Sequence, residues 1–251
     1  MKIIILVRIL WASGVQKIAI EEAKTLKRLG HEVKLVFLRE AISGQFLKPM
    51  LEGVEYEIFS TKQPRWLYST ITGMFMPDRK GDGALDYNLL KAYPHTVTRN
   101  EADYIICHDQ WAGIAGFRIN KSLGIPYSVF CHERVSGEYT VPILGKFAER
   151  TEEKVLRNAS MVFGVTQKVA DSVRKVYHIE AKPNLPGMDL KEYASFIDKK
   201  NVLIASATWD RNRNPENYIG IIERLQDFTL YIVGRWRVNA EYQEFLKLLR
   251  L

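Results

Sequence analysis

Two histidines with polar neighbours come at the ends of consecutive apolar runs. His108 and Asp109 follow the run YIIC, and His132 and Glu133 follow the run YSVFC. An imidazole beside a carboxylate can move a proton or bind substrate hydroxyls near neutral pH. We therefore expect a polar site here, although a single histidine at a strand end is more often a hydrogen-bonded structural residue. The four side chains have no helical H-x-x-x-H pair or close ligand spacing, so we expect no metal ion.

A third candidate is the dipeptide Ser13-Gly14, which lies between the first apolar run and a segment of helical period. Free N–H groups at a helix start attract phosphate, and glycine lets the backbone approach a ligand closely. The alternative is that Ser13 only caps the helix and Gly14 only makes the turn. The loop lacks the G-x-G-x-x-G fingerprint of NAD-binding proteins.

The elements that must position these residues are short runs rich in Ile and Val, which alternate with segments of helical period. This alternation is typical of an α/β fold with a parallel sheet. We expect strands at residues 3–7, 33–38, 54–59, 104–107, 127–131 and 161–165, and helices at 16–29, after Gly113 and at 146–158. Because parallel strands end at one edge of the sheet, where ligands bind, we expect Gly14, His108 and His132 to converge there.

A change of pattern near residues 181–198 predicts a domain boundary, because Pro183, Pro186 and Gly187 interrupt it. We expect one domain over residues 1–185, a linker over 186–198 and a second α/β domain over 199–251. The second domain would contain strands at 201–207 and 228–233 and helices at 215–225 and 239–251. About 50 residues bury too little apolar surface to be comfortably stable alone, so we expect this domain to be truncated or naturally reduced.

The composition is that of an ordinary globular protein, with 47% apolar and 26% charged residues among 251. The net charge of +7 favours an anionic partner, but no recognised motif points to nucleic acid, and we expect none. Cys107 and Cys131 lie in apolar runs, which predicts free thiols in a reducing compartment, the cytoplasm. The sequence contains no run of about 18 apolar residues, so we expect no membrane span.

Residues 61–81 mix basic side chains with aromatic and aliphatic ones. Such a segment could lie on a membrane interface, as a peripheral contact, or hold a lipid-linked substrate. The alternative is a helix that packs its apolar side on the sheet, because a strict two-faced pattern is not clear.

Five motifs, taken in order and spacing, resemble family 4 retaining glycosyltransferases. They are SGVQ with the helix ending RLGHEVKLV, then ADYIICHDQWAG, LGIPYSVFCHE, VFGVTQKVADSV and AKPNLPGMD. The resemblance covers nearly the whole chain and implies the GT-B fold, in which two Rossmann-like domains face each other over a cleft. The chain would then hold the acceptor-side domain and the start of the donor-side domain.

The resemblance also implies roles for the candidate residues of the first domain. His132 would be the catalytic histidine beside the transferred sugar. The acceptor would contact His108, Asp109 and Glu133, and the Ser13-Gly14 loop would bind the donor phosphates.

In the second domain, family members carry an Arg directly after the first strand and a Lys before the next helix, and both bind the donor diphosphate. Here Ala207 occupies the expected Arg position, and Arg213, with Arg211 as an alternative, occupies the Lys position. Arginine suits a diphosphate because of its forked hydrogen bonds. The family's E-x7-E motif belongs in this domain, so we interpret the same spacing at Glu32 and Glu40, in the first domain, as accidental.

The resemblance implies a hexosyltransferase or other glycosyltransferase that moves a sugar from a nucleotide sugar to an acceptor with retention. The acceptor would be a sugar, a lipid-linked molecule or another compound, and no cofactor or obligatory metal is implied. The alternative is a non-catalytic acceptor-binding or partner subunit of a split GT-B enzyme, whose site another chain completes.

Overall fold

The computed structural model describes residues 1–59, 89–138, 143–187, 201–236 and 238–249. The chain divides into two compact units, Met1–Met188 and Asp189–Leu251. This division falls within residues 186–198.

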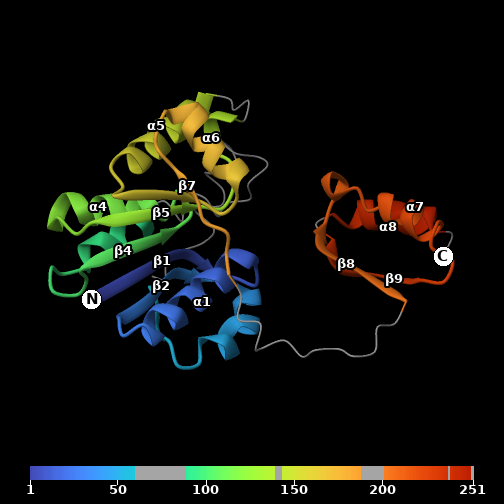
Figure 1. The fold of residues 1–251 in the computed structure, drawn as a ribbon, viewed down its shortest axis with the longest axis horizontal. Coiled ribbons are helices and arrows are strands. Elements are labelled where there is room, and N and C mark those ends of the chain that lie inside the picture. The colour runs from blue at the N-terminus through green and yellow to red at the C-terminus, as the bar shows by residue number, and fades with distance from the viewer. Residues whose placement is uncertain (60–88, 139–142, 188–200, 237, 250–251) are drawn as a thin grey trace. The chain divides into compact units, whose positions relative to one another are not determined.

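The first unit is a seven-stranded sheet with helices on both faces (Figure 1). Its strand order is β3-β2-β1-β4-β5-β6-β7, and every neighbouring pair is parallel. The strands are β1 (Lys2–Leu10), β2 (Glu32–Glu40), β3 (Glu55–Ile58), β4 (Tyr104–His108), β5 (Tyr127–Cys131), β6 (Met161–Gly164) and β7 (Lys182–Pro183). The predicted α/β class with a parallel sheet is confirmed.

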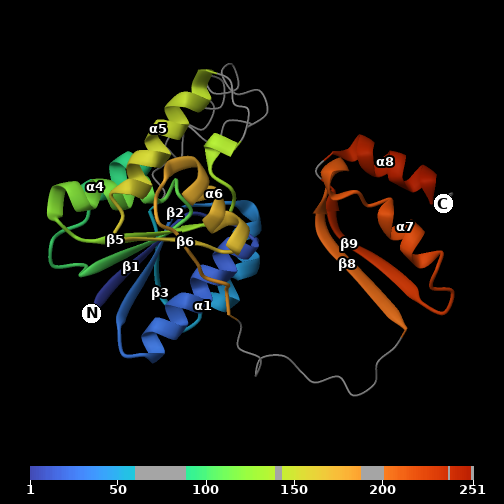
Figure 2. The ribbon, with the colours of Figure 1, turned by 45° about the horizontal axis from the view of Figure 1, so that its top comes forward.

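Helices cover the two faces of this sheet (Figure 2). They are α1 (Gly14–Arg28), α4 (Gly113–Leu123), α5 (Ile143–Arg157) and α6 (Gln167–Tyr177), with short 3-10 helices η1 (Ile42–Leu51), η2 (Tyr93–His95) and η3 (Ser136–Glu138). Successive side chains of β1 belong to two different hydrophobic clusters, one on each face of the sheet. Ile5 packs with α1 residues such as Ile20, whereas Ile4 belongs to the cluster that contains Ile119 of α4 and Val173 of α6.

The order of the strands changes direction between β1 and β4. Strands β2 and β3 lie to one side of β1, and β4 to β7 lie to the other. In open parallel sheets, ligands bind beyond the carboxyl ends of the strands at such a switch point. The loop after β1 and the loop after β4 flank this point. Four predicted site residues lie in these loops or at their borders: Ser13, Gly14 at the start of α1, His108 at the end of β4, and Asp109.

Five elements of the first unit are not among the expected ones: the 3-10 helices η1, η2 and η3, helix α6 and strand β7. Strand β7 forms inside the segment expected to be a break in the pattern, at the edge of the sheet. Pro183 is compatible with this place, because an edge strand does not need every backbone N–H for pairing.

The second unit contains β8 (Val202–Trp209), η5 (Arg211–Arg213), α7 (Asn217–Ile222), β9 (Thr229–Trp236) and α8 (Asn239–Leu248). Strands β8 and β9 are parallel, so the predicted β-α-β-α order is confirmed. The predicted end of β8 at Ala207 is wrong. Ala207 lies within the strand opposite Gly234, and the strand continues because buried Trp209 packs against the rings of Tyr218 and Trp236. Asp210, and not Ala207, is therefore the residue directly after β8.

Several predictions concern residues outside the described part of the chain. Residues 61–81 and most of residues 186–198 belong there, so the membrane or lipid contact and the linker stay predictions. Among the described helices, none has both the length and the apolar character needed to cross a membrane. Cys107 and Cys131 are buried free thiols, and burial raises the pKa of both, which fits two unreactive core residues.

Candidate active site

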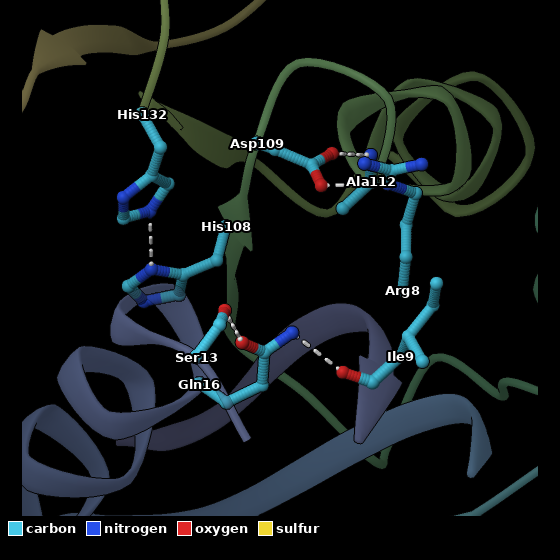
Figure 3. Close-up of polar contacts among 8 residues, drawn as sticks. All are labelled: Arg8, Ile9, Ser13, Gln16, His108, Asp109, Ala112 and His132. Atoms are coloured by element: carbon cyan, nitrogen blue, oxygen red, sulfur yellow. Dashed lines mark hydrogen bonds and ion pairs between the residues drawn. The ribbon is translucent and has the colours of Figure 1, made fainter. Parts of the chain in front are cut away.

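His108 and His132 meet at the carboxyl edge of the sheet (Figure 3). Nδ1 of His108 lies 3.0 Å from Nε2 of His132. His108 ends β4 and His132 follows β5, and the two rings stack with their centroids 5.2 Å apart. Phe130 of β5 stacks on His108 from a centroid distance of 5.3 Å. The structure therefore brings together the two histidines that were expected to converge.

A carboxylate from α1 extends this pair. Oε2 of Glu22 lies 2.6 Å from Nε2 of His108, which is fully buried. Sequence reasoning missed Glu22, because it is 86 residues away from His108 along the chain. One signal was present: Glu22 stands beside Ala23 and three residues after Ala19, both buried, so it lies at the border of the apolar face of α1.

His132 is a neutral side chain at physiological pH. Its burial, and after that the neighbouring His108, lowers its pKa to about 3. A neutral imidazole has one N–H donor and one nitrogen that accepts. His132 can therefore bind a ligand through a directional hydrogen bond but not as a cation.

Asp109 has both carboxylate oxygens occupied within the protein (Figure 3). Oδ2 accepts from Nε of Arg8 at 2.6 Å, and Oδ1 accepts from the backbone N–H of Ala112 at 2.6 Å, beside the start of α4. The carboxylate thus ties β1 to the loop after β4, and its predicted contact with the acceptor stays a prediction. Within the described residues, no group of three or more His, Cys, Asp or Glu side chains could hold a metal ion.

The start of α1 is open toward a ligand. Ser13 is the N-cap residue, but its hydroxyl donates to Oε1 of Gln16 at 2.5 Å and accepts no capping hydrogen bond. Gln16 in turn donates to the carbonyl of Ile9 at 2.7 Å (Figure 3). A Cβ atom added to Gly14 would meet nothing within 4 Å. The helix start therefore combines N–H groups that Ser13 leaves uncapped with free space, as an anion site requires.

The sequence model of a protein family, the glycosyl transferase 4-like domain, matches residues 13–184 of the chain. The chain belongs to this family. The match spans the open start of α1, both site histidines and the strands that position them, so the predicted resemblance to family 4 glycosyltransferases is confirmed. No curated protein sequence matches the chain.

Solved structures share the fold of this glycosyl transferase 4-like protein. HepE from Anabaena, in complex with UDP and glucose, has a TM-score of 0.68 and 16% identity over 100% of this chain and 65% of its own. Sucrose-phosphate synthase from Thermosynechococcus elongatus has a TM-score of 0.65 and 14% identity over 100% of this chain and 67% of its own. A UDP-N-acetylglucosamine 2-epimerase from Listeria monocytogenes, described as putative, has a TM-score of 0.57 and 11% identity over 96% of this chain and 64% of its own. The chain thus spans about two thirds of the length of these proteins.

The loop that carries His132 in the glycosyl transferase 4-like domain is held by hydrogen bonds to two helices, α5 and α6. Val135 donates its backbone N–H to Oγ of Ser172 on α6 at 3.1 Å, and Ser136 donates to Oε2 of Glu152 on α5 at 2.7 Å. Glu152 is fully buried, and this burial raises its pKa. Glu133 of the same loop is exposed, and its predicted contact with the acceptor stays a prediction.

The two predicted cations of the second unit differ in their surroundings. Arg211 pairs with Glu244 of α8 at 2.9 Å, and both side chains are largely exposed. Arg213 is exposed, and its side chain makes no hydrogen bond or ion pair with the residues that the structure describes. Of the two, Arg213 is the cation without a competing carboxylate, which favours it for contact with a diphosphate.

The low pKa of His132 predicts that acid destabilises the glycosyl transferase 4-like protein. An unfolded histidine takes up a proton near pH 6.5, whereas the folded His132 does so near pH 3. Between these values the unfolded state binds more protons, so stability is lost as the pH falls from about 6.5 toward 3. This one group contributes a slope of up to about 1.4 kcal/mol per pH unit.

Urea unfolding between pH 4 and pH 7 measures this slope. We expect His132→Gln to lose stability less steeply than the wild type, and His95→Gln, at an exposed histidine, to follow the wild type. Equal slopes for the wild type and His132→Gln would contradict the prediction.

Proposed function

We propose that the chain is the acceptor-side part of a glycosyltransferase that moves a sugar from a nucleotide sugar to an acceptor hydroxyl, with retention. The observation that carries this proposal is the contact between His108 and His132 at the carboxyl edge of the sheet, next to its switch point. The fold is shared with a UDP-N-acetylglucosamine 2-epimerase, so the fold alone does not decide between transfer and epimerisation. The match to the glycosyl transferase 4-like family favours transfer.

The chemical demands of this reaction fit the groups at the site. A leaving diphosphate needs positive or N–H groups, and the acceptor hydroxyl needs to be directed at the anomeric carbon. In this proposal the Ser13-Gly14 loop, Arg213 and, as an alternative, Arg211 bind the diphosphate. His132 contacts the reacting sugar and hydroxyl. No step requires a metal ion or a cofactor.

On the acceptor side, the proposal assigns a direct contact to Glu133, while His108 and Asp109 support the acceptor pocket. His108 is buried and acts through His132, whereas exposed Glu133 is free to meet an acceptor directly. A sugar, a lipid-linked molecule or another hydroxyl compound would serve as the acceptor. Residues 61–81 would supply a peripheral membrane contact, and we expect a cytoplasmic protein with no nucleic-acid partner.

A second candidate function is that of an acceptor-binding or partner subunit in a split GT-B enzyme. The observation that favours it is an apolar face on the two-stranded sheet of the second unit. Ile204, Tyr231 and Val233 are 70%, 54% and 42% exposed, and Ile204 lies opposite Tyr231 in the register of β8 and β9. Further strands or helices cover such a face in a complete Rossmann-like domain, and in this candidate another chain would supply them.

The test is the release of nucleoside diphosphate from a panel of nucleotide sugars by the purified chain, with and without sugar and lipid-linked acceptors. We expect donor-specific release that His132→Ala abolishes, because His132 contacts the reacting sugar and hydroxyl in this proposal. Thermal shifts identify the donor, since a ligand at about 100 times its dissociation constant adds roughly 2.7 kcal/mol. Acceptor binding without release of diphosphate from any donor would favour the partner subunit instead.

A further inference from the structure

Three polar side chains, from α1, β4 and the loop after β5, form a chain of contacts at the site. Glu22 of α1 contacts Nε2 of His108 at 2.6 Å, and Nδ1 of His108 contacts Nε2 of His132 at 3.0 Å. Both ring nitrogens of the fully buried His108 are therefore occupied. The expected roles of His108 and His132 give no role to Glu22.

The contact with Glu22 decides which nitrogen of His108 carries the proton. An ionised carboxylate accepts hydrogen bonds and cannot donate one. Nε2 of His108 must therefore be the N–H donor toward Glu22, in a short charge-assisted hydrogen bond. When His108 is neutral, its Nδ1 is then a bare acceptor.

This assignment passes on to His132. With its one proton on Nε2, a neutral His108 accepts at Nδ1, so Nε2 of His132 donates across the 3.0 Å contact. The remaining nitrogen of His132, Nδ1, then has a free lone pair. Within the part of the chain that the structure describes, this nitrogen makes no hydrogen bond.

Two other carboxylates, each next to Glu22 or His108 in the chain, are paired with cations. Asp109, next to His108 in the chain, is neutralised by Arg8 of β1 at 2.6 Å. Glu21, next to Glu22 on α1, pairs with Lys24 at 3.4 Å. Phe130 of β5 covers the ring of His108 and carries no charge. Glu22 is thus the carboxylate that directly contacts His108.

We propose that Glu22 is a positioning residue, which acts through His108 to hold His132 with Nδ1 as a hydrogen-bond acceptor for a ligand hydroxyl. The site would then select ligands that present an O–H group to His132. Only the identity of that hydroxyl, on the transferred sugar or the acceptor, rests on the proposed glycosyltransferase function.

The tautomers can be read directly by nitrogen-15 NMR of histidine-labelled protein at pH 7. The chain has five histidines, so single substitutions assign each signal. We expect neutral His108 and His132, each with its proton on Nε2. In Glu22→Gln the side-chain amide can donate as well as accept, so we expect a fraction of both rings to move the proton to Nδ1.

The matched control is Glu21→Gln, which removes a neighbouring carboxylate of similar exposure, 18% against 24% for Glu22. We expect it to leave both tautomers unchanged. Glu22→Asp keeps the carboxylate on a shorter side chain, and we expect it to keep the wild-type tautomers. A proton on Nδ1 of His132 in the wild type, a doubly protonated His108, or unchanged tautomers in Glu22→Gln would each overturn the proposal.

An activity measurement completes the test once a donor and an acceptor are found. We expect Glu22→Gln to lower kcat about tenfold with little change in KM for the donor, and Glu22→Asp to recover most of the loss. Full activity in Glu22→Gln would overturn the positioning role. The NMR measurement needs no donor, acceptor or turnover, so a failure of the glycosyltransferase proposal leaves its result intact.

Discussion

Replacing His132 with alanine is expected to lower kcat/KM for sugar transfer by at least about 100-fold, the usual cost of removing one hydrogen-bonding group that acts in the transition state. The substitution removes the imidazole of the candidate site and leaves the backbone of the loop after β5 in place. That loop is held independently by Ser172 and Glu152. The cost in stability is the lost partner of Nδ1 of buried His108, about 1–3 kcal/mol.

Steady-state kinetics and urea unfolding on the same preparations measure the two effects. His95→Ala is the control, because His95 is exposed on η2 and is not part of the site. We expect the control to match the wild type in both measurements. Unchanged turnover of His132→Ala, with donor binding at wild-type strength, would remove His132 from the reaction.

The strand-end histidines were predictable from the sequence because they depend on local patterns. His108 and His132 each follow a run of apolar residues, and parallel strands bring such positions to one edge. The partners of these residues were not predictable. Glu22 and Arg8 lie 86 and 101 residues away from His108 and Asp109, and their contacts depend on how α1 and β1 pack beside β4. Sequence periodicity predicts which face of a helix or strand is buried. It does not predict which side chains of another element contact that face.

The errors in the fold have similar physical reasons. Helix α6 carries a clear signal that was overlooked: Val169, Ala170, Val173 and Tyr177 are buried at helical spacing. In contrast, the end of β8 depends on Trp209, which is buried by rings from α7 and β9. Tertiary packing extends that strand beyond what its own sequence indicates.

Gly14→Ala is expected to weaken binding of the donor at least tenfold, which is about 1.4 kcal/mol. In the protein alone the added methyl group meets no atom within 4 Å, so the substitution creates no clash. Alanine also favours the helical conformation over glycine, so the stability of the chain should stay equal or rise. A loss of affinity would therefore come from the ligand, which the methyl group keeps away from the N–H groups at the start of α1.

The measurement is calorimetric titration with the nucleotide sugar that gives the largest thermal shift, and with its nucleoside diphosphate alone. If the helix start binds phosphate, both ligands should weaken by the same factor, because they share the diphosphate. Gly220→Ala is the control, since a Cβ there also meets nothing within 4 Å and Gly220 lies in α7 of the second unit. Wild-type affinity in Gly14→Ala would place the donor phosphates elsewhere. A loss confined to the sugar nucleotide would place the sugar, and not the diphosphate, against α1.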